Sequence, residues 1–294
     1  MLSNQEETFL TLFQMWISAI LGNTIVEVAV HTYTGMFFCD VDGTILPHGE
    51  HSVSPAFFSL VEEAQEANFL FCISSGRFHE SLIPLFAPVA SHVVFSSSNG
   101  CRVLYQGAEL FPNRGISRAL AEEITATLHA WGATSLISTT EAICLPSFAR
   151  EQMEARIYLA DGYARFFNDF CEVPGEVLQI TAVCDDHLQS ILGKSRKAWA
   201  SRFHVVTTGS HIFDICPTSK GESLKSISTH FSVPLAQTYA FGDDENDIPM
   251  LESAGKGYVM GSAHPGMRSR EFEHCHDLVG TIRGIVSPQH KELW

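Results

Sequence analysis

Short apolar runs that end in polar loops constrain the fold of this chain more than any other feature of its sequence. Residues 36–39 are apolar and stop at Asp40, and residues 69–73 and 93–95 are similar runs that stop at loops rich in serine. Runs of this length and composition are typical of strands that are buried on both faces of a sheet. The first part of the chain therefore predicts a buried sheet with polar loops at the carboxyl ends of its strands.

The segment between the first two runs predicts a helix over residues 54–67. Ser54 is a suitable N-cap, Pro55 suits the first helical position, and the apolar residues recur at helical spacing, namely Phe57, Leu60, Val61 and Ala64. A strand, helix, strand order favours parallel strands joined by right-handed crossovers. Ligands of such sheets bind beyond the carboxyl ends of the strands, where the polar loops lie.

The pattern changes after residue 100 and then returns. After residue 100 we expect two helices, over residues 117–131 and 187–200, and two strands, over residues 135–144 and 177–184. This mixture indicates a separate α+β insertion. Residues 211–216 and 238–241 then resume the short apolar strands followed by polar loops.

We therefore expect a doubly wound, Rossmann-like α/β core of parallel strands with an inserted α+β cap domain. The core would comprise residues 36–100 and 208–294, and the cap would comprise residues 101–207. Residues 1–35 are an extension of uncertain role. Its apolar part, residues 9–21, is shorter than the ~20 residues that cross a bilayer and follows acidic residues, so neither a transmembrane segment nor a secretory signal is expected. An accessory amphipathic helix is expected, with a membrane-surface or oligomer contact as the alternative.

Charge and cysteine content exclude several classes of partner. The formal net charge of −15 disfavours binding to nucleic acid or to an anionic membrane, so a small anionic substrate needs a local device such as a metal ion. The 8 cysteines show no Cys-x-x-Cys pair and no zinc-like cluster with histidine. Reduced thiols in a cytoplasmic protein are therefore expected.

Asp40 and Asp42 lie two residues apart on the loop that leaves the first predicted strand. Near one metal ion, Asp40 can attack phosphorus to form an aspartyl-phosphate, while Asp42 protonates the leaving group and later deprotonates water. Gly43 would let the backbone turn tightly beside the phosphate, and we expect Thr44 to bind the phosphate with it. Because Asp-Gly is also a common turn dipeptide, the motif alone leaves a simple turn open.

Two further groups can serve the same edge of the sheet. Ser75 and Gly76, in a Ser-Gly-Arg segment after the second run, offer a hydroxyl and a backbone amide to a phosphoryl oxygen, although a simple capped turn would also explain them. Lys220 follows the run at residues 211–216 and can neutralise charge on Asp40 and the phosphate. Taken alone, Lys220 would be read as a surface lysine.

Residues 242–247 place four carboxylates and one amide at the end of the run over residues 238–241. Mg²⁺ prefers hard oxygen ligands and keeps several waters, so one or two of these carboxylates together with Asp40 suffice to hold it. Acidic residues are also favoured in the first turn of a helix, which leaves a solvated acidic helix start as the alternative.

Five segments of the chain together resemble a known family. They read FFCDVDGTIL, ISSGR, SSNG, TSKGESL and FGDDENDIPML. In this order they resemble the motifs of the haloacid dehalogenase-like phosphohydrolase superfamily, and the spacing and insertion resemble its Cof-type branch, which has a large α+β (C2B-type) cap. The resemblance extends from Met36 to the carboxyl terminus.

The resemblance implies roles for individual residues. Asp40 would be the nucleophile and Asp42 the general acid and base. The carboxylates of Asp40 and Asp243 and the backbone carbonyl of Asp42 would hold Mg²⁺, with Asp247 near or behind the ion. The groups that would contact the phosphoryl group or lie beside the substrate are Ser75, Gly76, Lys220, Asn246, Asn99 and Gly100.

The chain departs from the family pattern at two places. Family members usually begin only a few residues before the first motif, so residues 1–35 have no counterpart. The usual Ala-Met-Gly-Asn-Ala segment appears as YVMGSA at residues 258–263, which keeps the strand and turn but loses the amide.

The expected function is Mg²⁺-dependent hydrolysis of a small phosphorylated metabolite, namely a sugar phosphate or a similar compound, with specificity set by the cap. Three alternatives remain open. A phosphomutase would share the double-aspartate loop, and a dehalogenase would leave Asp42 without a task. A catalytically silent ligand-binding module would not need the intact Asp40, Asp42, Lys220 and Asp243.

Overall fold

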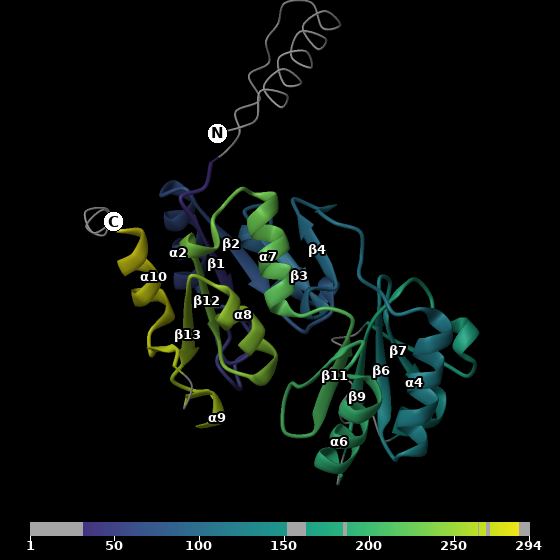
Figure 1. The fold of residues 1–294 in the computed structure, drawn as a ribbon. Helices are drawn as coiled ribbons and strands as arrows, with labels where there is room; N and C mark the ends of the chain where they lie inside the picture. The colour runs from purple at the N-terminus through teal and green to yellow at the C-terminus, as the bar shows by residue number, and fades with distance from the viewer. Residues whose placement is uncertain (1–31, 152–162, 185–186, 264, 269–270, 288–294) are drawn as a thin grey trace, which may run out of the picture. The chain divides into compact units, whose positions relative to one another are not determined.

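The computed structural model describes residues 32–151, 163–184, 187–263, 265–268 and 271–287 (Figure 1). Met1–Thr32 and Tyr33–Trp294 form two separate units of the chain, and the sheets and helices below belong to the second. The helix expected over residues 9–21 lies outside the described residues.

An eight-stranded sheet contains the first and the last strands of the described chain. Its strand order is β14-β13-β12-β1-β2-β3-β4-β5, of which the pairs from β14 to β3 are parallel and the last two pairs are antiparallel. The strands are β1 (Gly35–Cys39), β2 (Phe69–Ser74), β3 (Val93–Ser97), β4 (Arg102–Tyr105), β5 (Ala108–Glu109), β12 (Thr238–Gly242), β13 (Lys256–Met260) and β14 (Glu273–Cys275).

Helices cover both faces of this sheet because its central strands are apolar on both sides. In β1, Phe37 and Cys39 pack into one hydrophobic cluster, whereas Met36 and Phe38 pack into another on the opposite face. The first cluster includes residues of α2, α3 and α10, and the second includes residues of α7, α8 and α9. The helices are α2 (Pro55–Glu66), α3 (His79–Leu85), α7 (Lys220–His230), α8 (Ile248–Ser253), α9 (Pro265–Arg268) and α10 (Leu278–Val286). The predicted doubly wound α/β core is confirmed.

A second, six-stranded sheet has the order β10-β11-β9-β6-β7-β8 and is antiparallel except for the β7–β8 pair. Residues of α4 and α6 pack with one face of it in a separate hydrophobic cluster. Its elements are β6 (Thr134–Thr139), β7 (Ile143–Pro146), β8 (Ala164–Phe167), β9 (Val177–Val183), β10 (His204–Thr207), β11 (Ile212–Cys216), α4 (Arg118–Ala130) and α6 (Leu188–Trp199). This sheet is the α+β insertion expected from the sequence.

Several strands differ from the sequence-based expectation. β11 lies in the residues expected for the core but pairs with β9 and β10 in the six-stranded sheet. β4 and β5 lie in the residues expected for the cap, but β4 pairs with β3, and β5 pairs with β4. The single strand expected over residues 135–144 is two strands, β6 and β7, paired as a hairpin. A short, largely apolar run such as β11 suits a parallel or an antiparallel sheet equally, so the strand it pairs with cannot be read from the local sequence.

Among the described residues, no helix combines the length and the apolar character that crossing a bilayer requires.

Candidate active site

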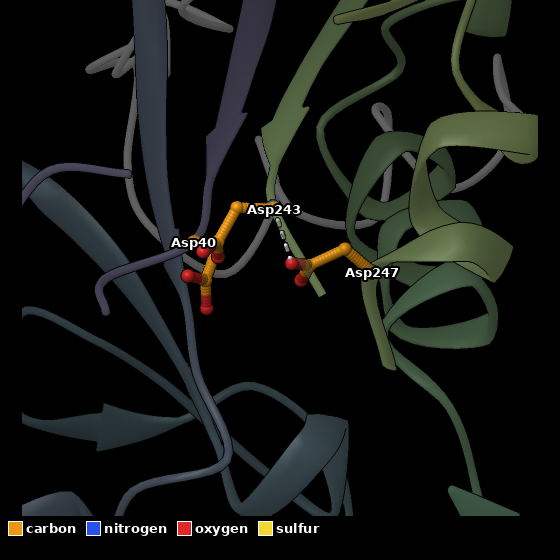
Figure 2. Close-up of side chains that lie close together, drawn as sticks. All are labelled: Asp40, Asp243 and Asp247. Carbon is orange, nitrogen blue, oxygen red and sulfur yellow. Dashed lines mark hydrogen bonds between the residues drawn. The ribbon is translucent and has the colours of Figure 1, made fainter. Parts of the chain in front are cut away.

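Two carboxylates meet where neighbouring parallel strands end. Asp40 directly follows β1 and Asp243 directly follows β12, and the backbone N–H of Asp40 donates to the carbonyl of Phe241 at 2.9 Å. Both residues are buried, with 5% and 6% of their surface exposed. Figure 2 shows the two side chains leaving adjacent strands, together with a third carboxylate, Asp247. One carboxylate oxygen from each of the three residues lies within 4.8 Å of the others.

Asp247 is fixed by the backbone of the loop that carries Asp243. It ends the 3₁₀ turn η7 (Glu245–Asp247), and its Oδ2 accepts hydrogen bonds from the N–H groups of Asp243 (3.0 Å; dashed in Figure 2) and Asp244 (3.1 Å). Gly242 leaves the room for this arrangement, because a Cβ there would lie 2.5 Å from the Cβ of Asp247. The loop therefore holds the Asp247 carboxylate against the backbone of Asp243 and Asp244.

Lys220 joins the nucleophile candidate to Asp247. Its fully buried Nζ donates to Oδ1 of Asp40 and to Oδ1 of Asp247, both at 2.6 Å. Lys220 begins α7, which packs closely on α8, since a Cβ on Gly221 would lie 2.2 Å from the carbonyl oxygen of Pro249. Burial lowers the pKa of Lys220, but the carboxylates of Asp247 and Asp40 outweigh burial and raise it above its usual value, so the ammonium stays charged.

The carboxylates of this cluster carry more charge than the single ammonium balances. Burial, with Asp247 next, raises the pKa of Asp40 well above its usual value, and burial together with Asp247 raises the pKa of Asp243 to about 7. When all three carboxylates are ionised, the one ammonium leaves two negative charges in a buried site, and this repulsion is part of what raises these pKa values. Hard oxygen donors with a net charge of that sign fit a divalent cation such as Mg²⁺.

Position 43 requires a glycine, because of both its backbone conformation and the side chain that lies next to it. Its φ of +83° lies in the left-handed region, and a Cβ would lie 2.0 Å from Oδ2 of Asp243. The backbone of the first loop therefore passes directly against a candidate metal ligand. The hydroxyl of Ser262, in the segment that departs from the family pattern, donates to the carbonyl of Gly43 at 3.1 Å. A serine thus contacts this loop where the family's amide is missing.

Asp42 does not join the buried carboxylates with its side chain. Its side chain is half exposed, and both oxygens accept from Arg77, Oδ2 from Nε and Oδ1 from Nη2, each at 2.8 Å. The sequence placed Arg77 in a motif but gave no sign of this ion pair, because the two residues are 35 positions apart. Asp42 is therefore held on the exposed side of the loop that begins at Asp40.

The hydroxyl groups expected to bind phosphate lie on the same edge of the sheet. Ser75, 1% exposed, follows β2, and its Oγ accepts from the N–H of Arg77 at 3.1 Å. Thr44 is also buried, and its Oγ1 has no hydrogen-bond partner among the described residues. Gly76 follows Ser75 in the chain, and its backbone carbonyl accepts a hydrogen bond from Nε2 of Gln179 at 3.3 Å.

Asn99 connects the loop after β12 to the six-stranded sheet. Its Oδ1 accepts from Nδ2 of Asn246 at 2.9 Å, while its own Nδ2 donates to Gln179 at 3.0 Å and to Asp214 at 2.8 Å. Gly100 beside it has a φ of +94°, with no room for a Cβ against Ser223. Asn99 was expected beside the substrate, and in the structure its amide is bonded to other side chains at both ends.

Sequence reasoning missed the two partners from the six-stranded sheet, Gln179 and Asp214. Both are buried polar residues inside strands that are otherwise largely apolar, VLQITAV and IFDIC. A buried polar residue in such a run needs a partner, and this signal could have marked both residues. His48 was also missed, and its Nε2 lies 3.2 Å from Oδ2 of Asp243.

Comparisons with known proteins agree with the motifs. Residues 37–270 match the family described as haloacid dehalogenase-like hydrolase. The chain is 26% identical over 259 residues to phosphatase YwpJ of Bacillus subtilis, covering 78% of this chain and 90% of YwpJ. It is 24% identical over 234 residues to HMP-PP phosphatase of Serratia proteamaculans, covering 78% of this chain and 85% of that protein.

Solved structures show the same fold. A haloacid dehalogenase-like hydrolase from B. subtilis matches with a TM-score of 0.76 and 23% identity, covering 85% of this chain and 99% of that chain. A structure described as a subclass IIB sugar phosphatase of the same superfamily matches with a TM-score of 0.73 and 17% identity, covering 88% of this chain and 100% of that chain. The family match spans more than half of the sequence, and the chain belongs to the haloacid dehalogenase-like hydrolases.

Proposed function

We propose that this protein is a Mg²⁺-dependent phosphatase that hydrolyses a small phosphorylated metabolite through an aspartyl-phosphate on Asp40. One observation carries the proposal: the buried ammonium of Lys220 joins Asp40 to Asp247, and an oxygen of Asp243 lies within 4.8 Å of both carboxylates. This arrangement provides a nucleophile, a fixed positive charge and a place for a cation. The curated relatives named above are phosphatases, which supports the same reaction class.

The proposed metal ligands are the carboxylates of Asp40 and Asp243 and the backbone carbonyl of Asp42, with Asp247 behind them. A divalent cation bound there would neutralise the buried carboxylates and the charge of the phosphoryl group. Gly43 supports this choice of metal ligands, because a residue without a side chain lets the loop that begins at Asp40 approach Asp243.

Asp40 would act as the nucleophile in the first step. Because Lys220 holds Oδ1 at 2.6 Å, the proposal assigns the attack on phosphorus to Oδ2. A bond forms between Oδ2 and phosphorus as the bond to the leaving oxygen breaks. Ser75, Thr44 and Asn246 would hold the other phosphoryl oxygens, and the charge of Lys220 would stabilise those that become more negative.

Asp42 would move the protons in both steps. It gives a proton to the leaving oxygen, and then it removes one from the water that attacks the aspartyl-phosphate, which releases phosphate and restores Asp40. Both Asp42 oxygens accept from Arg77 in the structure, so at least one of these hydrogen bonds must open before Asp42 can donate. Arg77 would therefore orient Asp42 until substrate enters.

The cap would supply the rest of the substrate-binding surface. We assign the six-stranded sheet with α4 and α6 to the cap and the eight-stranded sheet to the core, which moves β11 into the cap and β4 and β5 into the core. The relatives carry different substrates in their names, HMP-PP for one and a sugar phosphate for another. A sugar phosphate remains our proposed substrate class, and a cytoplasmic location remains a prediction.

Trapping the intermediate tests this function directly. Wild-type protein with Mg²⁺ and a generic aryl phosphate should release free phosphate, and borohydride reduction during turnover should convert Asp40 to homoserine, detected by mass spectrometry of its peptide. Asp40→Asn should abolish both signals. Asp277→Asn is the matched control, because it changes an exposed helix N-cap of α10 in the same way.

Two outcomes would contradict the proposal. Near-normal turnover by Asp40→Asn would remove Asp40 as the nucleophile. An isomerised sugar phosphate in place of free phosphate would assign the chain to the phosphomutases.

A further inference from the structure

We propose that Asp214 is a positioning residue that sets the direction of the Asn99 and Asn246 amides at the phosphate end of the site. This inference rests on the proposed function for its catalytic consequence. Asp214 lies in β11 and is 2% exposed, and none of the catalytic steps above uses it. Its carboxylate lies against two loops of the core.

The direction of the first amide follows from the chemistry of a carboxylate. Oδ2 of Asp214 lies 2.8 Å from Nδ2 of Asn99, and Oδ1 accepts from the hydroxyl of Thr181 at 2.6 Å. An ionised carboxylate accepts hydrogen bonds and has none to donate. Asn99 must therefore turn its NH₂ group toward Asp214, and its carbonyl oxygen must point the other way.

The direction of the second amide follows from the first. The carbonyl oxygen of Asn99 only accepts, and the Asn246 side chain lies 2.9 Å from it, so Asn246 must present its NH₂ group there. The carbonyl end of the Asn246 amide then faces away from Asn99. The second N–H of that NH₂ group is then the donor that Asn246 keeps for a phosphoryl oxygen, and reversal of the amide would offer its carbonyl oxygen there instead.

A second chain of hydrogen bonds runs in the same direction. Gln179 donates from Nε2 to the carbonyl of Gly76 (3.3 Å) and to Oγ1 of Thr181 (3.1 Å), which fixes Oε1 as the acceptor for Asn99 at 3.0 Å. The hydroxyl of Thr181 then donates to Asp214. Two donors of the network, Nδ2 of Asn99 and the hydroxyl of Thr181, therefore end at the Asp214 carboxylate.

The charge on Asp214 is compatible with this role at neutral pH. Burial raises the pKa of Asp214 to about 6, and the hydrogen bonds from Thr181 and Asn99 oppose that rise.

The network also joins two parts of the protein, because Asp214 and Gln179 belong to the six-stranded sheet while Asn99 and Asn246 follow strands of the eight-stranded sheet. The amide direction at the phosphate end therefore depends on the six-stranded sheet being in place.

Substitutions of graded polarity test the proposal. Asp214→Val removes the acceptor and should lower both kcat/KM and the affinity for inorganic phosphate by roughly tenfold or more, the scale of a lost hydrogen bond to a charged group. Asp214→Asn can accept or donate, so it should show a smaller loss. Thr139→Val is the control, because it removes buried hydrogen bonds of the six-stranded sheet at the β6–β7 turn, outside this network. It should lower Tm while both activity measures stay within about twofold of wild type.

Side-chain amide NMR on the wild-type protein gives a readout that needs neither activity nor a folded variant. The NH₂ groups of Asn99 and Asn246 should exchange slowly with solvent and should show contacts to each other. Solvent-like exchange would overturn the proposal, and so would a folded Asp214→Val protein with wild-type phosphate affinity. Failure of the phosphatase assignment would appear separately, as absence of turnover in wild-type protein whose amides are still protected.

Discussion

The loops of the eight-stranded sheet and the strands of the six-stranded sheet contribute to the same site in different ways. The core contributes two carboxylates from loops directly after strands, as Asp40 follows β1 and Asp243 follows β12, and Lys220 from the first residue of α7. The six-stranded sheet contributes from inside its strands, through Gln179 in β9 and Asp214 in β11. The core loops thus carry the proposed chemistry, whereas the strand residues act on it by holding other side chains.

The largest expected effect comes from the centre of the core site. Lys220→Met leaves Asp40 and Asp247 buried without their shared ammonium, which should cost about 3–5 kcal/mol of unfolding free energy without Mg²⁺. Turnover should fall by ~10²–10³-fold because a fixed charge at the phosphoryl group is lost. Urea unfolding and steady-state kinetics measure the two effects. Turnover within a few-fold of wild type would show that the core charge is not catalytic.

The sequence could predict this half of the site because each group follows its own strand. Asp40, Ser75 and Asp243 each stand after a short apolar run, and parallel strands bring such positions to one edge of a sheet. The ion pair between Asp42 and Arg77 could not be predicted, since side-chain direction on a loop is set by its surroundings.

The side chains that Gln179 and Asp214 contact could not be predicted locally, for a related reason. β11 is a five-residue strand with four apolar residues around Asp214, and only its pairing with β9 and β10 places Asp214 near Asn99. Pairing depends on residues far along the chain, so the fold class was predictable and the sheet to which β11 belongs was not.

Gly43 offers a way to separate backbone strain from contact with a metal ligand. Gly43→Ala should lower Mg²⁺ affinity by roughly 10–100-fold, because its Cβ would lie 2.0 Å from Oδ2 of Asp243 and would displace that carboxylate. Gly49→Ala is a matched control, since Gly49 has a similar φ of +90° with nothing within 4 Å of a Cβ. Titration of Mg²⁺ by calorimetry compares the two. Equal affinities in both variants would mean that the approach to Asp243 is unimportant.

Without Mg²⁺, the core cluster should make stability fall as the pH rises. Burial raises the pKa of Asp243 from 3.8 to about 7, so the folded state binds its proton more tightly than the unfolded state between those values. The stabilisation is complete below about pH 4 and is lost by about pH 7, at roughly 1.4 kcal/mol per pH unit, so on the order of 3 kcal/mol of it falls between pH 5 and pH 7. Urea unfolding in EDTA at pH 5 and pH 7.5 measures it. Asp243→Asn should reduce the difference, and saturating Mg²⁺ should oppose it; an unchanged slope in Asp243→Asn would contradict the assignment.

Arg77 tests whether the exposed pair serves catalysis through Asp42. Arg77→Met should lower kcat roughly tenfold for an alkyl phosphate, because a loosely held Asp42 protonates a poor leaving group less effectively. A nitrophenyl phosphate needs little protonation and should lose less. A purely structural ion pair would lower both rates equally, so the ratio of the two substrates decides, and Arg77→Lys should recover part of the alkyl rate.

The smallest effect is expected where the two sheets meet through an exposed contact. Glu245, between Asp243 and Asn246, accepts from the N–H of Thr207 in β10 at 3.0 Å and from Nη2 of Arg196 in α6 at 2.5 Å. The Arg196 and Glu245 side chains are 42% and 35% exposed, and ion pairs of this kind contribute about 0.2–1 kcal/mol. Glu245→Gln should therefore change kcat/KM by only ~2–5-fold, with a larger change at low ionic strength because salt screens exposed charges. The buried contact through Asp214 should show a larger loss with little dependence on salt. The comparison fails if the Glu245 and Asp214 variants lose kcat/KM equally and with the same salt dependence. Burial of a contact between the two sheets would then make no difference to its effect on the core.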